Sequence, residues 1–182
     1  MTNEDKLNAS TKKSPPMYDY SSIKVKVVET RQDIGEATNA MMLNMNKKKE
    51  IGLDAEWNYT SGPHGTPSSQ SAVLTIQIAY RNTKNIIQVI IIKTGKLRTL
   101  PDQLKSLLCR RDISIAGVKV SGDLIEICKV FKVAEINAVH QKVRSNVYNL
   151  GPFTRDRDVV QDARTASLEL LAERLLGRPT GW

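Results

Sequence analysis

The feature that most restricts how this chain can fold is a short apolar strand with two acids on one face. Alternation from Ile51 to Trp57 predicts a strand in which Asp54 and Glu56 point to the same side. The other side carries apolar residues only, namely Ile51, Leu53, Ala55 and Trp57. Carboxylates on a hydrophobic strand are costly to bury unless a metal or a cation lies beside them. The pattern therefore indicates a core on one face and a compensated charge on the other.

A strand and a helix are predicted before this segment. Val25 and Val27 alternate with lysines, which indicates a half-buried strand near the edge of a sheet. Thr30, followed three residues later by Asp33, indicates a helix N-cap. The helix would then place a stripe of apolar residues in the core, namely Ile34, Ala37, Met41, Met42 and Met45. Lys47–Lys49 is predicted to end the helix, where cations complement its dipole.

Two more strands are predicted after the acidic strand. They comprise Val73–Tyr80 and Ile86–Ile92, with a turn at 81–85 between them. The segment from Asn58 to Ser71 is rich in Gly, Pro, Ser and Thr, so it is predicted to be a connecting loop. Three consecutive strands with such connections predict an antiparallel meander.

Helices and strands alternate in the rest of the chain. Pro101 and Asp102 are predicted to open a helix, and Ile113–Val118 is predicted to be a buried strand. Gly122 and Asp123 are predicted to begin the next helix, with Asp123 in its first turn.

The pattern is weaker after this helix. Ala134–Val139 is predicted to be a short strand, whereas 141–163 has no clear pattern. Residues 167–176 carry Leu168, Leu171, Ala172, Leu175 and Leu176 at helical spacing, and Gly177 is placed to end that helix.

Composition indicates one ordinary domain with a basic surface. Residues 1–20 are predicted to be a disordered tail, and residues 21–182 are predicted to form one domain. The formal charge of +8 suits a nucleic-acid partner, and an inert basic surface explains it equally well. Basic residues that could contact phosphates, or simply be solvated, are Lys47, Lys48, Lys49, Arg110, Arg111, Arg155 and Arg157.

Other sequence signals exclude several classes of protein. Cys109 and Cys128 lie in apolar helical contexts, which indicates core roles and no zinc site or disulfide framework. The first residues lack the apolar core of a signal peptide, and no later stretch is long enough to span a bilayer. We therefore expect an intracellular protein, in the nucleus or the cytoplasm, without a membrane partner.

Three acids could carry metal-dependent chemistry. Two divalent metals about 4 Å apart can hydrolyse a phosphodiester, and carboxylate oxygens are the ligands that hold such metals. Asp54 and Glu56 can supply such ligands from one strand face, and Asp123 at a strand-to-helix junction could complete the cluster. Taken without context, the Asp54 and Glu56 pair is more often structural.

The order of the motifs resembles a known family. Three segments occur in order, namely Ile51-Gly52-Leu53-Asp54-Ala55-Glu56-Trp57, Ala72–Ala79 and Ala116-Gly117-Val118-Lys119-Val120-Ser121-Gly122-Asp123. Together they resemble the DEDD-superfamily 3′–5′ exonuclease domains of the ribonuclease D and Werner-helicase type. The helix after Leu100-Pro101 and the segment from Ser167 to Gly177 also match that layout, so the resemblance covers roughly Val25 to Gly177.

The resemblance implies a fold, a site and an activity. The fold would be α/β and ribonuclease-H-like, with a mixed five-stranded sheet of antiparallel meander plus parallel strands, flanked by helices on both sides. Asp54, Glu56 and Asp123 would be the catalytic, metal-binding residues for Mg²⁺ or Mn²⁺. The substrate would be the 3′ end of DNA or RNA.

The family's third motif has no counterpart in this sequence. It consists of a Tyr or His before a final Asp, and it would fall after Gly177, where too few residues remain to supply it. The resemblance thus implies an incomplete active site in a shortened gene product, an expressed fragment or a domain that has lost cleavage. We expect exposed apolar surface near the last predicted helix, because the absent helix normally covers part of the core.

Several residues are assigned no role in the site. Asp156, Asp158 and Asp162 could substitute for the missing acid but are interpreted as solvated loop acids. Where relatives often carry an Asp-Leu pair, this chain has Val139-His140, and neither His140 nor His64 is assigned a catalytic role.

Three functional hypotheses follow. The first is a 3′–5′ exonuclease-like domain whose activity is weak or absent. The second is a non-catalytic module on the same fold that binds nucleic acid or protein. The third is a ribonuclease-H-like nuclease that cuts internally. This hypothesis is less favoured, because residues other than the acids also match the exonuclease family.

Overall fold

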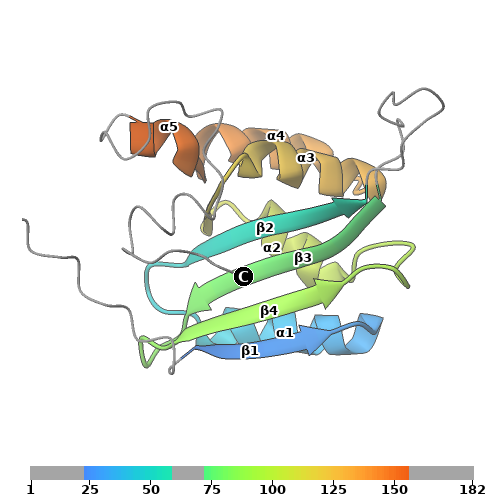
Figure 1. The fold of residues 1–182 in the computed structure, drawn as a ribbon, viewed down its shortest axis with the longest axis horizontal. Helices are drawn as coiled ribbons and strands as arrows, with labels where there is room; N and C mark the ends of the chain where they lie inside the picture. Colours follow the sequence, from blue (N-terminus) through green and yellow to red (C-terminus); the bar gives the residue numbers. More distant parts are fainter. Residues whose placement is uncertain (1–22, 59–71, 156–182) are drawn as a thin grey trace, which may run out of the picture.

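One mixed sheet runs through the described part of the chain, residues 23–58 and 72–155 of a computed structural model (Figure 1). Its strands are β1 (Lys24–Val28), β2 (Glu50–Asn58), β3 (Ala72–Arg81), β4 (Ile87–Lys93), β5 (Ser114–Gly117) and β6 (Val147–Asn149). The helices are α1 (Arg31–Asn44), α2 (Asp102–Cys109), α3 (Val120–Val130), α4 (Ile136–Ser145) and α5 (Leu150–Arg155).

The sheet confirms the predicted α/β class and has one strand more than expected. Its six strands have the order β1-β4-β3-β2-β5-β6. β2, β3 and β4 form the predicted antiparallel meander. β1 pairs parallel with β4, and β5 pairs parallel with both β2 and β6. The additional strand β6 has three residues, which is too short for alternation to reveal it in the sequence.

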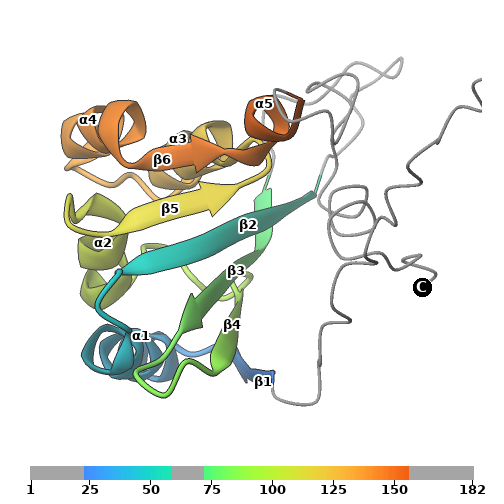
Figure 2. The ribbon, with the colours of Figure 1, turned by 90° about the vertical axis from the view of Figure 1, so that its left-hand side faces the viewer.

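The two faces of the sheet differ in what covers them. α1 and α2 lie against one face, and α3 and α4 pack near its β6 end (Figures 1 and 2). The core lies between this face and the helices, and its buried strand residues include Ile51, Leu53, Ile76, Ile78, Ile90, Ile92 and Ile115. Within the described residues, only the short helix α5 borders the second face, which we call the open face.

β1 is an edge strand, as predicted, but its burial differs from the prediction. Val25 and Val27 are 58% and 55% exposed, although their alternation indicated a half-buried strand. Both residues pair with β4 residues of the open face, Val89 and Ile91. The prediction was wrong because alternation shows that a strand has an apolar face and does not show whether another element covers it.

Two local predictions about the helices need correction. α1 has the predicted cap, in which Thr30 Oγ1 accepts a hydrogen bond from the Asp33 N–H. However, α1 ends at Asn44, so Lys47–Lys49 lies beyond its last turn and does not end it. Ala134–Val139, predicted as a strand, instead leads into α4, where Val139 is fully buried. A short apolar run fits a strand and a buried helix equally well.

Several predictions concern residues outside the described part. They are the tail 1–20, most of the loop 58–71 with His64, the acids Asp156, Asp158 and Asp162, and the helix 167–176 with Gly177. Among the described residues, no helix is long and apolar enough to cross a membrane.

Candidate carboxylate site

β2 carries the first two acids near its C-terminal end. Asp54 is half-buried and pairs with Gln77 on β3, whereas Glu56 is exposed and pairs with Thr75. Because alternate residues of a strand share a face, Asp54 and Glu56 point to the same side, as the sequence predicted. A register shift follows between Glu56 and Trp57, where the regular pairing with β3 is interrupted.

The third acid comes from the connection after β5. Asp123 lies in the first turn of α3, which begins at Val120, two residues before the predicted start. Gly117 ends β5 so close to β2 that a Cβ there would lie 2.3 Å from the Leu53 carbonyl oxygen. Lys119 then adopts a left-handed conformation with φ of 55°, which turns the chain into the helix. This close approach places the start of α3 beside β2.

A direct contact joins the two halves of the site. Trp57 Nε1 donates a hydrogen bond to Asp123 Oδ1 at 3.2 Å. The Trp57 ring is half-buried and packs against the core, which agrees with the packing role predicted for it. The hydrogen bond itself was not predicted, although a buried indole N–H usually finds an acceptor and that requirement was a usable signal.

A second side chain fixes the start of α3. Asn149, at the end of β6, accepts a hydrogen bond from the Ser121 N–H at 3.2 Å and donates one to Ser121 Oγ at 3.0 Å. The first N–H groups of a helix have no partner within the helix, so Asn149 supplies one from another element. No signal in the sequence indicated this contact, because Asn149 lies in the segment without a clear pattern.

Burial disfavours the charged forms of two of the acids, and repulsion from neighbouring acids adds to this effect at one of them. Burial raises the pKa of Asp54, and a hydrogen bond with the Ala55 backbone opposes this rise. Burial also raises the pKa of Asp123, to which the charges of Asp54 and Glu56 add. The Trp57 hydrogen bond and the charge of Lys119 act in the opposite direction on the Asp123 pKa. Asp123 thus lies near enough to both β2 acids to be influenced by their charge.

The carboxylate oxygens of the three acids suit a divalent cation, but the positions of the acids relative to one another suit it less well. All three side chains offer hard carboxylate oxygens, and no ion pair between described residues includes any of them. Yet no group of three or more His, Cys, Asp or Glu side chains in the described part is arranged to hold a metal ion. Asp54, Glu56 and Asp123 thus do not form such a group among the described residues.

Two of the basic candidates and both cysteines have structural contacts. Lys49 Nζ and Arg110 Nη2 both lie 2.7 Å from Asp112 Oδ2, so these two candidates for phosphate contact are already paired. The Arg110 and Lys49 hydrogen bonds hold the pKa of Asp112 well below its usual range. Cys128 is buried in the core, which raises the pKa of its thiol to about 12, and Cys109 packs against the same core.

Comparisons with known proteins identify the fold. No family model matches the chain, and no curated protein matches its sequence. Among solved structures, the EXD2 exonuclease domain has a TM-score of 0.53 at 21% identity, covering 86% of this chain and 70% of that chain. The same domain soaked in Mg has a TM-score of 0.52 at 20% identity, covering 85% and 71%.

A longer nuclease shows the same likeness. Trypanosoma brucei RNase D in complex with RNA U12 has a TM-score of 0.61 at 16% identity, covering 87% of this chain and 50% of that chain. The chain therefore spans about half the length of that protein. These comparisons show that the described fold is structurally similar to DEDD 3′–5′ exonuclease domains, as the resemblance in sequence implied.

Proposed function

We propose that this chain is a 3′–5′ exonuclease-like domain that acts on nucleic-acid ends by two-metal-ion phosphodiester hydrolysis. The observation that supports this most is the position of Asp123. Its side chain comes from α3 and interacts electrostatically with Asp54 and Glu56 on β2. Three acids from two elements thus gather at one end of a central strand, on a fold shared with exonuclease domains.

The three carboxylates would have different tasks from the residues around them. Asp54, Glu56 and Asp123 would hold Mg²⁺ or Mn²⁺, which when bound would activate the attacking water and stabilise the leaving oxygen. Trp57 would keep one oxygen of Asp123 engaged, so that the other is directed elsewhere. Turnover is expected to be weak unless a further donor joins the three acids, because they do not form a metal-binding group as they stand.

The partners named for the solved relatives agree with this proposal. One EXD2 domain structure was soaked in Mg, and the RNase D structure holds RNA. The formal charge of +8 would also favour a polyanionic substrate. We therefore propose the 3′ end of DNA or RNA as the substrate.

A non-catalytic nucleic-acid-binding module is the second candidate. The observation that favours it is the lack of a three-residue metal-binding group among the described side chains. Such a module would bind a strand without divalent metal, and its binding would survive the Asp54→Ala substitution.

The test is degradation of 3′-labelled and 5′-labelled single strands in Mg²⁺ or Mn²⁺. We expect stepwise loss from the 3′ end that disappears in Asp54→Asn. Glu36→Gln, a change at an exposed acid of α1, serves as the matched control and should keep full activity. Strand binding without turnover would support the second candidate, whereas cleavage of a circular strand would contradict both and indicate internal cutting.

A further inference from the structure

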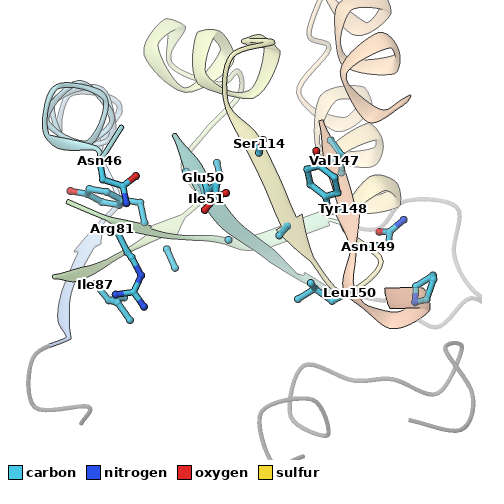
Figure 3. A pocket seen from close by; sticks show the side chains of 15 residues that line it. Asn46, Glu50, Ile51, Arg81, Ile87, Ser114, Val147, Tyr148, Asn149 and Leu150 are labelled. Carbon is cyan, nitrogen blue, oxygen red and sulfur yellow. The ribbon is translucent and has the colours of Figure 1, made fainter. Parts of the chain in front are cut away.

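The open face of the sheet changes in character along β2. Near the start of β2 it forms a groove of about 740 Å³, and Glu50, Arg81 and Ser114 are among the residues that line this groove (Figure 3). Glu56 lies on the same face near the other end of β2. Neither Glu56 nor Thr75, its neighbour on β3, lines the groove. The surroundings of Glu56 are therefore separate from it.

A buried hydroxyl group without a partner occurs next to Glu56 in the sheet. Thr75 Oγ1 is buried and has no hydrogen-bond partner, and it is the only such side-chain atom among the described residues. Two threonines that are buried as whole residues, Thr38 and Thr94, have the usual arrangement. Their hydroxyl groups donate to backbone carbonyl oxygens at 2.7 Å and 3.0 Å, respectively. A buried polar group without a partner costs free energy, so its presence requires an explanation.

Strand pairing determines which side chains can supply the missing partner. Thr75 lies directly opposite Glu56 on β2 and directly opposite Lys93 on β4. Directly opposite residues of antiparallel strands share a face, and their Cβ atoms are about 4.5–5.5 Å apart. A lysine ammonium group has donors only, whereas an ionised carboxylate accepts. Glu56 is therefore the opposite residue to which the Thr75 hydroxyl can donate.

The Glu56 side chain is not held in place by other described residues. It is exposed, and no ion pair or hydrogen bond between described residues includes it. β2 lies between β3 and β5 in the sheet, and α3 follows β5, so Glu56 has Thr75 on one side and Asp123 on the other. A carboxylate has two oxygens. One oxygen of Glu56 can thus face a cation shared with Asp123 while the other accepts from Thr75.

We propose that Thr75 is a positioning residue of the carboxylate site, whose hydroxyl group donates a hydrogen bond to Glu56 when a divalent cation is bound. The cation would hold one oxygen of Glu56, and Thr75 would fix the other. Residues that orient metal ligands in this way typically change metal affinity by about 10–100-fold. The cost of the unpaired hydroxyl in the metal-free fold would then be offset on binding. This inference rests on the cation-binding part of the proposed function.

The test combines two measurements on Thr75→Val, which removes the hydroxyl group and keeps a branched side chain. Without divalent metal, the variant should melt about 2–4 °C above wild type, because the unpaired buried group is gone. In calorimetric titration with Mn²⁺ alone, it should bind at least about 10-fold more weakly than wild type. Thr75→Ser keeps a hydroxyl group and should bind Mn²⁺ as wild type does.

Thr38→Val is the matched control, because the Thr38 hydroxyl already has a partner. This control should melt below wild type, since it loses an existing hydrogen bond, and it should keep the Mn²⁺ affinity of wild type. A residue with a purely structural role would not raise stability and weaken Mn²⁺ binding together. The opposite signs of the two changes in Thr75→Val are thus the result that supports the proposal.

Other outcomes would overturn the proposal or separate it from the proposed function. Unchanged Mn²⁺ affinity in Thr75→Val would overturn it, and so would a melting temperature equal to or below that of wild type. If wild type bound no Mn²⁺, both this inference and two-metal hydrolysis would fail. If Thr75→Val weakened Mn²⁺ binding but wild type degraded no strand, the role of Thr75 would be supported and only the proposed activity contradicted.

Discussion

At the scale of single residues, the site places Asp123 near two other acids and beside a donor, Trp57, that binds one of its oxygens. Asp123 interacts with Asp54 and Glu56 in a half-buried environment, while the Trp57 indole donates to it. A cluster of like charges opposes folding unless a cation joins it, because each charge loses water and repels the next. The same arrangement suits a cation-binding role, so we expect the charge of Asp123 to lower the stability of the metal-free fold.

The first prediction is that Asp123→Asn stabilises the metal-free protein at pH 7 by about 1 kcal/mol or less, after allowance for solvent screening. Burial raises the Asp123 pKa in the folded state. The cost of the charge is therefore absent below the unfolded-state pKa and is fully present once the pH has risen above the folded-state pKa. Urea unfolding from pH 4 to 7 should show a growing difference between variant and wild type, and a constant difference would contradict this explanation.

The second prediction concerns the close approach that positions α3. Gly117→Ala should destabilise the fold by about 2–3 kcal/mol, because its Cβ would lie 2.3 Å from the Leu53 carbonyl oxygen. Gly122→Ala in α3 is the matched control, since no atom lies within 4 Å of its Cβ. This control should gain about 0.5–1 kcal/mol from helix propensity. Urea unfolding measures the free energy of unfolding of both variants. Equal changes would mean that β5 and β2 do not approach as closely at Gly117 as the structure shows.

At the scale of elements, the short strand β6 connects the sheet to α3. Its last residue, Asn149, holds Ser121 in the first turn of the helix that carries Asp123. Gly117 brings the helix near β2, and Asn149 fixes how it starts. A strand of three residues thus helps to determine where α3, and the acid that it carries, begins.

The third prediction is that Asn149→Ala costs about 1 kcal/mol, like the loss of a helix cap. Asn149→Asp should keep most of the stability, because a carboxylate can accept from both the Ser121 N–H and its hydroxyl and is favoured near a helix N-terminus. Hydrogen exchange in the first turn of α3 measures local loosening. Faster exchange in the Ala variant alone is expected, and unchanged exchange in both would show that Asn149 does not hold α3.

At the scale of the whole molecule, the distribution of basic charge bears most on contacts with a nucleic acid. The formal charge is +8, and some of the cations are already used inside the fold, as Lys49 and Arg110 are with Asp112. Lys47 and Lys48 are exposed beyond the end of α1. They remain candidates for phosphate contact, because no ion pair between described residues includes them.

The fourth prediction is that single-strand affinity falls as salt rises, with a slope of about −0.7 in log–log terms for each phosphate contacted. Changing both Lys47 and Lys48 to Gln should reduce the slope by about 1.4 if both contact phosphates. Fluorescence anisotropy at several salt concentrations measures this. An unchanged slope would show that the two lysines are only solvated, and affinity without salt dependence would exclude the electrostatic mode of binding.

Local patterns in the sequence determined much of this protein. Alternation predicted β2 with both acids on one side, the meander, and the N-cap at Thr30, because these features depend on residues close in the chain. The order of the motifs predicted the fold that the solved structures share. The roles of Asp54, Glu56 and Asp123 in catalysis and metal binding stay predictions.

The tertiary structure alone decided what depends on distant contacts. Trp57 and Asp123 are separated by 66 positions, and no local pattern indicates that they meet. The exposure of Val25 and Val27 likewise depends on what lies over the open face rather than on their own alternation. Periodicity determines which side chains share a face, because it follows from backbone geometry, whereas burial and hydrogen-bond partners follow from how the elements pack.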